Sequence, residues 1–233
     1  MMRTKAVALP LLLALMLIAA LTSVVSAQTE APTLHIRVAH FSPDTPTVDI
    51  YLNGTRTPIQ GLAFGSISDW VEIPAGSYQV AAITAERQRV IGPATFDLPA
   101  DAWITVAAVG SLESGTLQAA PIIEDYSPLE AGQARVTVFH GIEGVVPVDV
   151  LAGDSKIVDL LAFPGKLGGN DGAATLTVPA GVYDLQVVPA GETVRVLFDL
   201  KRTILVANTA YFVAAIGPAD APQVVVKATS LGQ

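Results

Sequence analysis

The sequence predicts an all-β protein made of two tandem antiparallel β-sandwich domains that follow an N-terminal signal peptide. Three observations support this prediction. Apolar residues alternate with polar ones at a period of two, turn signals recur every 8–12 residues, and five sequence blocks return in the same order about 100 residues later. Residues beyond 27 show no apolar stripe of helical period.

Composition excludes several classes of function. The net charge is −8 with only 13 Lys and Arg residues, which argues against a nucleic-acid partner because phosphate binding needs cationic side chains. The chain has no cysteine, so disulfides, cysteine-type zinc sites, iron–sulfur clusters and thiol catalysis are excluded. Charged residues make up 15% of the chain and hydrophobic residues 51%, which is unlike a disordered protein.

Residues 1–27 have the pattern of a secretory signal peptide. Arg3 and Lys5 precede an apolar run over residues 6–21, and Val25-Ser26-Ala27 places small residues before a cut after Ala27. The alternative is a retained anchor, because residues 6–25 could just span a bilayer. We therefore expect a secreted or extracytoplasmic protein, at the cell surface or in the periplasm, that meets the membrane only through the signal peptide before cleavage.

The repeated blocks define two copies of one unit. His40 and Asp49 recur as His140 and Asp149 with the same spacing. The expected organisation is a short linker at 28–33, a first sandwich at 34–123, a linker at 124–133 and a second sandwich at 134–229. The matching blocks are 37–50 with 136–150, 62–65 with 161–165, 73–78 with 178–183, 96–98 with 198–200, and 106–110 with 213–217.

Each copy is expected to contain about seven strands. Residues 48–52 alternate between apolar and polar, and Asn53-Gly54 after them favours a type I′ hairpin turn. The apolar runs 103–109 and 211–216 are typical of central strands that are covered on both faces. The last strands are expected at 117–123 and 224–228. This pattern predicts an immunoglobulin-like or transthyretin-like sandwich.

The segment VAHFSPDTPTVDIY at residues 38–51, with LAFG at 62–65 and PAGSY at 74–78, resembles a secreted prokaryotic family known as domain of unknown function 4397. The resemblance covers 34–123 well and 134–229 less well. It implies an exported, often tandem β-sandwich module with no agreed biochemical activity.

The repeated His–Asp pair is the sharpest candidate for chemistry. Antiparallel pairing of the first two strands would bring His40 near Asp49, and Ser42 would then be the nucleophile of a hydrolase. The second copy argues against this interpretation, because Gly141 follows His140 where a nucleophile would be needed. We therefore expect the histidines to hold the following loop through hydrogen bonds.

A metal site is a second interpretation of the same region, because imidazole and carboxylate groups are zinc ligands. The alternation of side chains along a strand weakens this interpretation, because His40 and Asp49 are expected on opposite faces. We predict no metal and no cofactor. The residues at repeat-equivalent positions, structural or ligand-binding, are His40, Asp44, Asp49, His140, Glu143 and Asp149.

Tyr51 and Trp70 are candidate binding aromatics, because each lies on the face opposite its apolar neighbours. Exposed rings on a sandwich can stack on sugars or anchor a protein. Alternatively, a second layer or the neighbouring domain covers them.

These observations favour a non-enzymatic exported module that acts at or outside the cell envelope in adhesion, scaffolding or ligand binding. Its partner would be an envelope component, a polysaccharide or a protein. Two alternatives remain open: a secreted hydrolase or metal-dependent enzyme that uses the His40/Asp49 region, and a carbohydrate-binding module.

Overall fold

The computed structural model describes residues 31–166 and 172–231. The chain divides into two compact units, Met1–Ala31 and Pro32–Gln233, and the second contains every strand of the described residues. The signal peptide predicted at 1–27 lies outside the described residues. No helix in the described ranges is long and apolar enough to cross a membrane.

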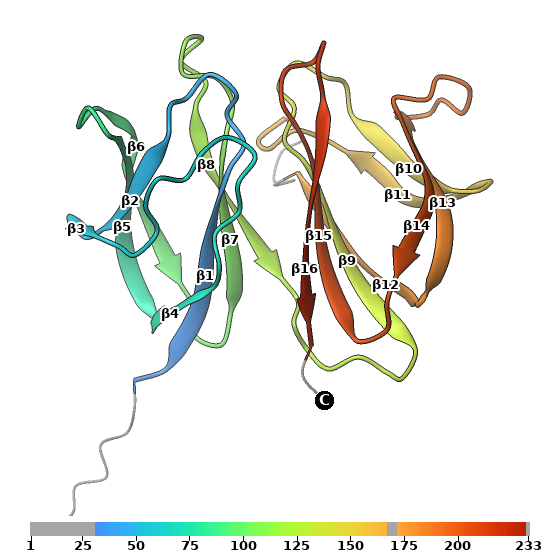
Figure 1. The fold of residues 1–233 in the computed structure, drawn as a ribbon, viewed down its shortest axis with the longest axis horizontal. Helices are drawn as coiled ribbons and strands as arrows, with labels where there is room; N and C mark the ends of the chain where they lie inside the picture. Colours follow the sequence, from blue (N-terminus) through green and yellow to red (C-terminus); the bar gives the residue numbers. More distant parts are fainter. Residues whose placement is uncertain (1–30, 167–171, 232–233) are drawn as a thin grey trace, which may run out of the picture. The chain divides into compact units, whose positions relative to one another are not determined.

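The first half of the fold consists of two four-stranded sheets (Figure 1). The sheet that we call the β1 sheet has the order β4-β1-β7-β8, and the β2 sheet has the order β3-β2-β5-β6. The strands are β1 (Thr33–His40), β2 (Val48–Leu52), β3 (Thr55–Arg56), β4 (Val71–Pro74), β5 (Gly76–Thr84), β6 (Arg89–Leu98), β7 (Trp103–Val109) and β8 (Gln118–Glu124).

The second half repeats this strand order. The β9 sheet has the order β12-β9-β15-β16, and the β10 sheet has the order β11-β10-β13-β14. The strands are β9 (Gln133–His140), β10 (Val148–Ala152), β11 (Ser155–Leu161), β12 (Ala173–Pro179), β13 (Gly181–Pro189), β14 (Phe198–Leu205), β15 (Thr209–Ile216) and β16 (Gln223–Ser230). The all-β prediction, with sheets in two pairs, is therefore confirmed.

The strand directions add a feature that the alternation of residues could not predict. Most neighbouring strands are antiparallel, but β1 pairs with β7 in parallel and β9 pairs with β15 in parallel. In the first half the chain leaves β1, visits the β2 sheet twice with β4 in between, and then returns as β7; a strand reached by such a long crossover can pair in parallel. Each half contains eight strands in the described residues, one more than expected.

Local sequence explains the first hairpin and the central strands. Asn53 and Gly54 have φ angles of 49° and 77°, which are the positive values that a type I′ turn requires between β2 and β3. Strands β7 and β15 lie inside their sheets, as their apolar runs predicted.

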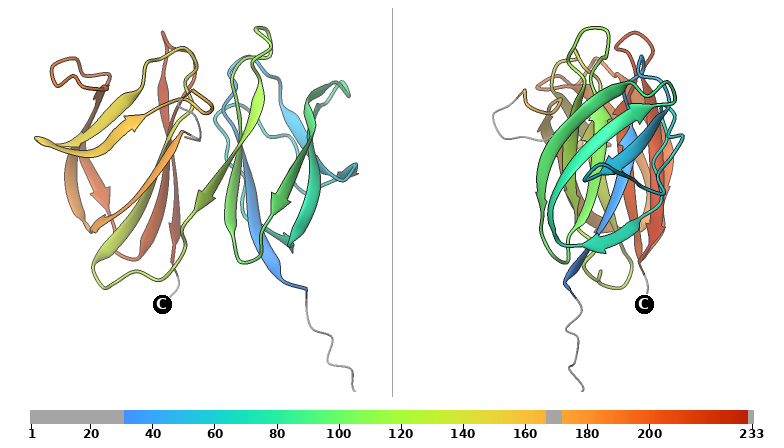
Figure 2. Two further views of the ribbon diagram at one scale, coloured as in Figure 1. Left: turned by 180° about the vertical axis from the view of Figure 1, so that it is seen from behind. Right: turned by 90° about the vertical axis from the view of Figure 1, so that its left-hand side faces the viewer.

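The β1 and β9 sheets pack against each other as well as against their own partner sheets (Figures 1 and 2). Ile36 and Val38 on β1 belong to the cores shared with the β2 sheet. Phe41 belongs to a different cluster that also holds Phe139 and Phe212 of the second half. The ring centroids of Phe41 and Phe139 are 6.0 Å apart.

A buried ion pair, Arg37 with Glu124, lies beside this contact between the halves. The Arg37 side chain is fully buried, and its Nη2 lies 2.8 Å from Oε1 of Glu124. Its Nε donates to Oγ1 of Thr105 at 2.7 Å, and its guanidinium lies 4.3 Å from the ring centre of Trp70 and 5.3 Å from that of Phe212. A buried charge needs such partners, since an unpaired one is strongly destabilising.

We predict that Phe139→Ala lowers the free energy of unfolding by roughly 3–5 kcal/mol, because it removes a buried ring and leaves a cavity between the two halves. Equilibrium urea unfolding measures the loss. Val182→Ala, at an exposed site on β13, is the control and should change stability by less than about 0.5 kcal/mol. Equal losses for the two variants would show that the contact between the halves does not stabilise the fold.

Candidate functional site

The two repeated histidines end equivalent strands and contact the loops that follow. Nε2 of His40 lies 3.1 Å from the carbonyl oxygen of Pro46, and Nε2 of His140 lies 3.4 Å from that of Val146. Nδ1 of His140 accepts a hydrogen bond from the backbone N–H of Ile142, which makes Nε2 the donor. Burial lowers the pKa of both imidazoles, so they are neutral at pH 7.

The repeated aspartates hold different backbone segments from the histidines. Oδ1 of Asp49 accepts from the N–H of Gly61 at 2.9 Å, and its other oxygen pairs with Arg56. The buried Asp149 accepts from the N–H groups of Leu160 and Gly191, both at 2.9 Å.

Asp149 also receives a cation, because Nζ of Lys156 lies 2.7 Å from its Oδ2. Burial acts to raise the pKa of Asp149, but the hydrogen bonds and Lys156 outweigh it and lower the pKa to about 2. The carboxylate is therefore charged at any pH near neutrality and stabilises the folded loops.

The expected His40–Asp49 pairing between adjacent strands does not occur. Strand β1 lies in the β1 sheet and β2 lies in the facing β2 sheet, so the two strands are not hydrogen-bonded neighbours. The Ser42 hydroxyl donates to Asp44 at 3.1 Å and lies 2.8 Å from Oγ1 of Thr45. The groups of the hypothetical hydrolase are thus engaged with other partners.

Asp44 and Glu143 form contacts with loop residues of the first half. Asp44 accepts from Oγ of Ser111 at 2.6 Å and from the N–H groups of Leu112 and Glu113 at 2.9 Å. Burial opposes ionisation of Asp44, but these bonds prevail and lower its pKa to about 2. Glu143 of the second half accepts from Oγ1 of Thr116 at 2.7 Å.

The metal interpretation requires three ligand side chains around one point. Over residues 31–166 and 172–231, no group of three His, Asp or Glu side chains has that arrangement.

Trp70 is largely covered by neighbouring side chains. Its ring meets those of Trp103 and Tyr126 edge-on, at centroid distances of 5.0 and 5.5 Å, and Arg37 stacks on it. Tyr126 belongs to the segment that joins the two halves, and its hydroxyl lies 3.4 Å from Oγ1 of Thr229 on β16. Tyr51 is half-buried on β2. The geometry of Trp70 favours a packing role over an open sugar platform.

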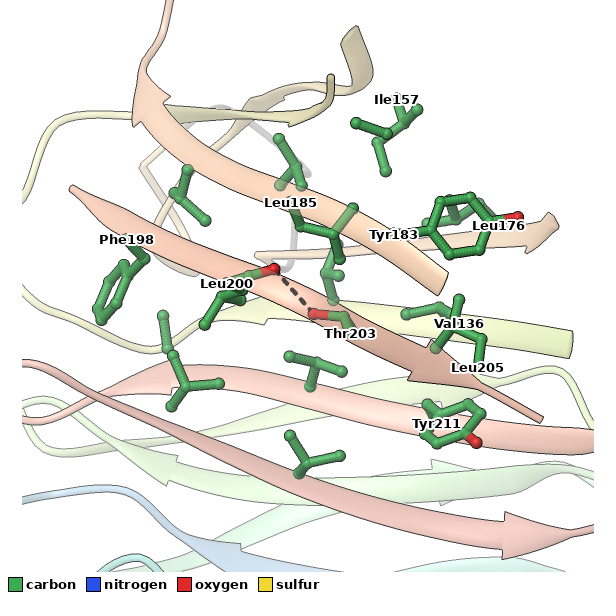
Figure 3. A pocket seen from close by; sticks show the side chains of 18 of the residues that line it. Val136, Ile157, Leu176, Tyr183, Leu185, Phe198, Leu200, Thr203, Leu205 and Tyr211 are labelled. Atoms are coloured by element: carbon green, nitrogen blue, oxygen red, sulfur yellow. Dashed lines mark hydrogen bonds between the residues drawn. The ribbon is translucent and has the colours of Figure 1, made fainter. Parts of the chain in front are cut away.

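The most notable concave feature lies between the β9 and β10 sheets of the second half (Figure 3). It is a cavity of about 240 Å³ whose lining is almost entirely apolar. The side chains that surround it in Figure 3 include Val136, Leu176, Tyr183, Leu185, Phe198, Leu200, Thr203, Leu205 and Tyr211. The sequence analysis did not identify these residues as a site, because each one fits the pattern of an ordinary strand residue.

The first half has a hollow of similar size, about 230 Å³, at a different edge. It lies beside β3 and β4, where Thr55, Arg56 and Thr57 add polar groups to its lining. The cavity of the second half reaches the equivalent strands β11 and β12, and it also reaches β14 and β16. The two halves therefore share a strand order, but the hollow of the second half extends to the β14 and β16 edge, where the first half is closed.

Comparison with known proteins places the chain in a family. The family model described as "Domain of unknown function (DUF4397)" matches residues 34–151, which is more than half of the chain. The chain belongs to this family. The DUF4397 match begins within β1 and ends within β10, so it runs through the joining segment into the second half. No curated protein matches the chain.

Solved structures with some likeness to this DUF4397 protein are distant. A Bacteroides uniformis protein, described as a "putative cell adhesion protein", is 12% identical with a TM-score of 0.28, over 88% of this chain and 99% of its own. A Bacteroides fragilis protein with the same description is 8% identical with a TM-score of 0.23, over 85% of this chain and 99% of its own. The Bacillus anthracis TIE protein is 10% identical with a TM-score of 0.21, over 75% of this chain and 32% of its own.

We predict that Asp149→Asn lowers the free energy of unfolding by about 2 kcal/mol at pH 7. This free energy corresponds to a carboxyl pKa of 3.8 in the unfolded chain that is lowered to about 2 in the folded protein. Because the folded-state pKa is depressed, this stability is present above pH 4 and is lost as the pH falls toward 2. The difference between wild type and variant should shrink across that window in urea unfolding. Asp159→Asn is the control, since its exposed carboxylate also pairs with Lys156. A deficit of constant size from pH 7 to pH 2 would contradict the prediction.

A second prediction concerns the two buried histidines. In the unfolded chain the two imidazoles have their ordinary pKa of 6.5, and burial lowers their pKa in the folded protein. As the pH falls, the unfolded chain therefore binds protons at a higher pH than the folded protein does. Stability should therefore fall between pH 7 and pH 5, and the double variant His40→Gln with His140→Gln should lose most of this dependence. An unchanged urea midpoint for the wild type over this range would contradict it.

Proposed function

We propose that this protein is a non-enzymatic, exported module that acts at or outside the cell envelope by binding, as an adhesion, scaffold or ligand-binding component. The observation that carries the proposal is the use of the repeated polar residues. His40, His140, Asp49 and Asp149 each hold backbone of a neighbouring loop, which is how a scaffold uses such groups.

The signal-peptide pattern of residues 1–27 supports export, with cleavage after Ala27. We further propose that 34–123 and 134–229 are the two sandwich domains and that 124–133 links them. The buried contact between the halves, centred on Phe41, Phe139 and Phe212, would hold two binding surfaces in a fixed relation. An envelope component, a polysaccharide or a protein is the class of partner that such a module would bind.

Co-sedimentation tests the proposal. Purified residues 28–233 are mixed with washed envelopes of the producing organism, with and without EDTA. We expect saturable pelleting, because a binding module occupies a finite number of sites, and we expect EDTA to leave it unchanged. Protein that stays in the supernatant at every concentration would overturn the proposal. Release by EDTA would show that a metal ion mediates the binding.

A further inference from the structure

The cavity of the second half has a cause that can be traced to strand register. In the first half Gly76 pairs with Leu98, and Tyr78 pairs with Phe96. In the second half the equivalent Gly181 pairs with Leu205, and the equivalent Tyr183 pairs with Thr203. The position of Phe96 is therefore taken by Thr203.

At this position the second half therefore has less side-chain bulk between its sheets. Phe96 packs against both apolar clusters of the first half and fills the space between its sheets. Thr203 is much smaller, and its side chain lies on the wall of the cavity (Figure 3). The pairing of β13 with β14 contains a register shift between Tyr183 and Leu185. As a result, Phe198, which matches Phe96 in sequence, pairs with Val187 and not with Tyr183.

The cavity is open to solvent through apolar side chains. Ile204 on β14 is 65% exposed and Val226 on β16 is 56% exposed, and both also line the cavity. In the first half, the register position of Ile204 is occupied by Asp97. Strands β14 and β16 are edge strands of facing sheets, so no strand covers them.

The few polar groups in the wall already have partners within the protein. Oγ1 of Thr203 donates to the carbonyl oxygen of Leu200 at 3.0 Å (Figure 3). The hydroxyl of Tyr183 donates to the carbonyl of Pro179 at 2.6 Å, and that of Tyr211 accepts from the N–H of Val206 at 2.9 Å. The described residues of the lining include no charged side chain. A charged or strongly polar ligand would lose its hydration here without compensation.

We propose that this cavity is a binding site for an uncharged, apolar small molecule, with the shape of a hydrocarbon ring or a single aliphatic chain. Its volume of about 240 Å³ exceeds the apolar cavity of about 150 Å³ that is known to hold benzene. Removal of the ligand's apolar surface from water drives the binding. The inference rests on the proposed binding function and names its ligand class.

The test uses purified residues 28–233 and the uncharged fluorophore N-phenyl-1-naphthylamine, without envelopes. We expect a saturable rise in fluorescence for the wild type. Thr203→Phe restores the bulk of Phe96 and should raise the dissociation constant by at least about tenfold. Thr177→Phe makes the same change at an exposed site on β12 outside the cavity and should bind like the wild type.

A second variant guards against misfolding of the first. Val226→Asp places a charge in the cavity lining, at a site on β16 that is 56% exposed and pairs with the cavity residue Val213. It should weaken binding several-fold with an unchanged melting temperature.

Competition then distinguishes a free ligand from a membrane lipid. Displacement of the fluorophore by n-decanol alone indicates a free molecule, and displacement also by a monomeric short-chain phosphatidylcholine, which offers the fluorophore no bilayer to enter, indicates a lipid chain. Both results support the site.

No saturable binding by the wild type, or equal binding by folded Thr203→Phe, would overturn the proposal. Because no envelope is present, this failure is independent of failure in the co-sedimentation experiment.

Discussion

The burial of both faces of the β1 and β9 sheets is the constraint on which the rest of the structure depends. Each sheet packs on its partner sheet through one face and on the other half of the protein through the opposite face. The central strands β1, β7 and β9 therefore carry mostly buried side chains, whereas the edge strands β4, β8 and β16 keep exposed positions. The buried Arg37 is held there by Glu124, Thr105 and the aromatic rings beside it, which contact its Nε, Nη2 and guanidinium face, while its Nη1 has no hydrogen-bond partner among the described residues.

The polar residues at the strand ends follow from the same constraint. A loop that leaves a buried sheet has backbone groups that need partners, and the repeated His and Asp side chains supply them. The same residue types at the same spacing also suit a catalytic site. What separates the two roles is whether the side chains meet one another, and here each one meets backbone.

Duplication lets one half serve as a reference for the other. Both halves have the same strand order and the same Tyr hydroxyl contact, from Tyr78 to Pro74 and from Tyr183 to Pro179. Within this shared order, Thr203 in place of Phe96 is a difference in side-chain bulk at the β14 edge, where only the hollow of the second half extends. The Phe-Asp-Leu blocks at 96–98 and 198–200 conceal this difference. They align in sequence, but Phe96 pairs with Tyr78, whereas Phe198 pairs with Val187 and not with Tyr183.

The sequence by itself determined the all-β class, the duplicated blocks and the first hairpin, because alternation and turn residues act over a few neighbouring positions. It could not determine that β1 and β2 lie in different sheets, nor that Trp70 is covered by Trp103 and Tyr126. These features and the cavity were decided by tertiary structure. Strand partners and register depend on contacts between residues far apart in the chain, and a local pattern fits several pairings equally well.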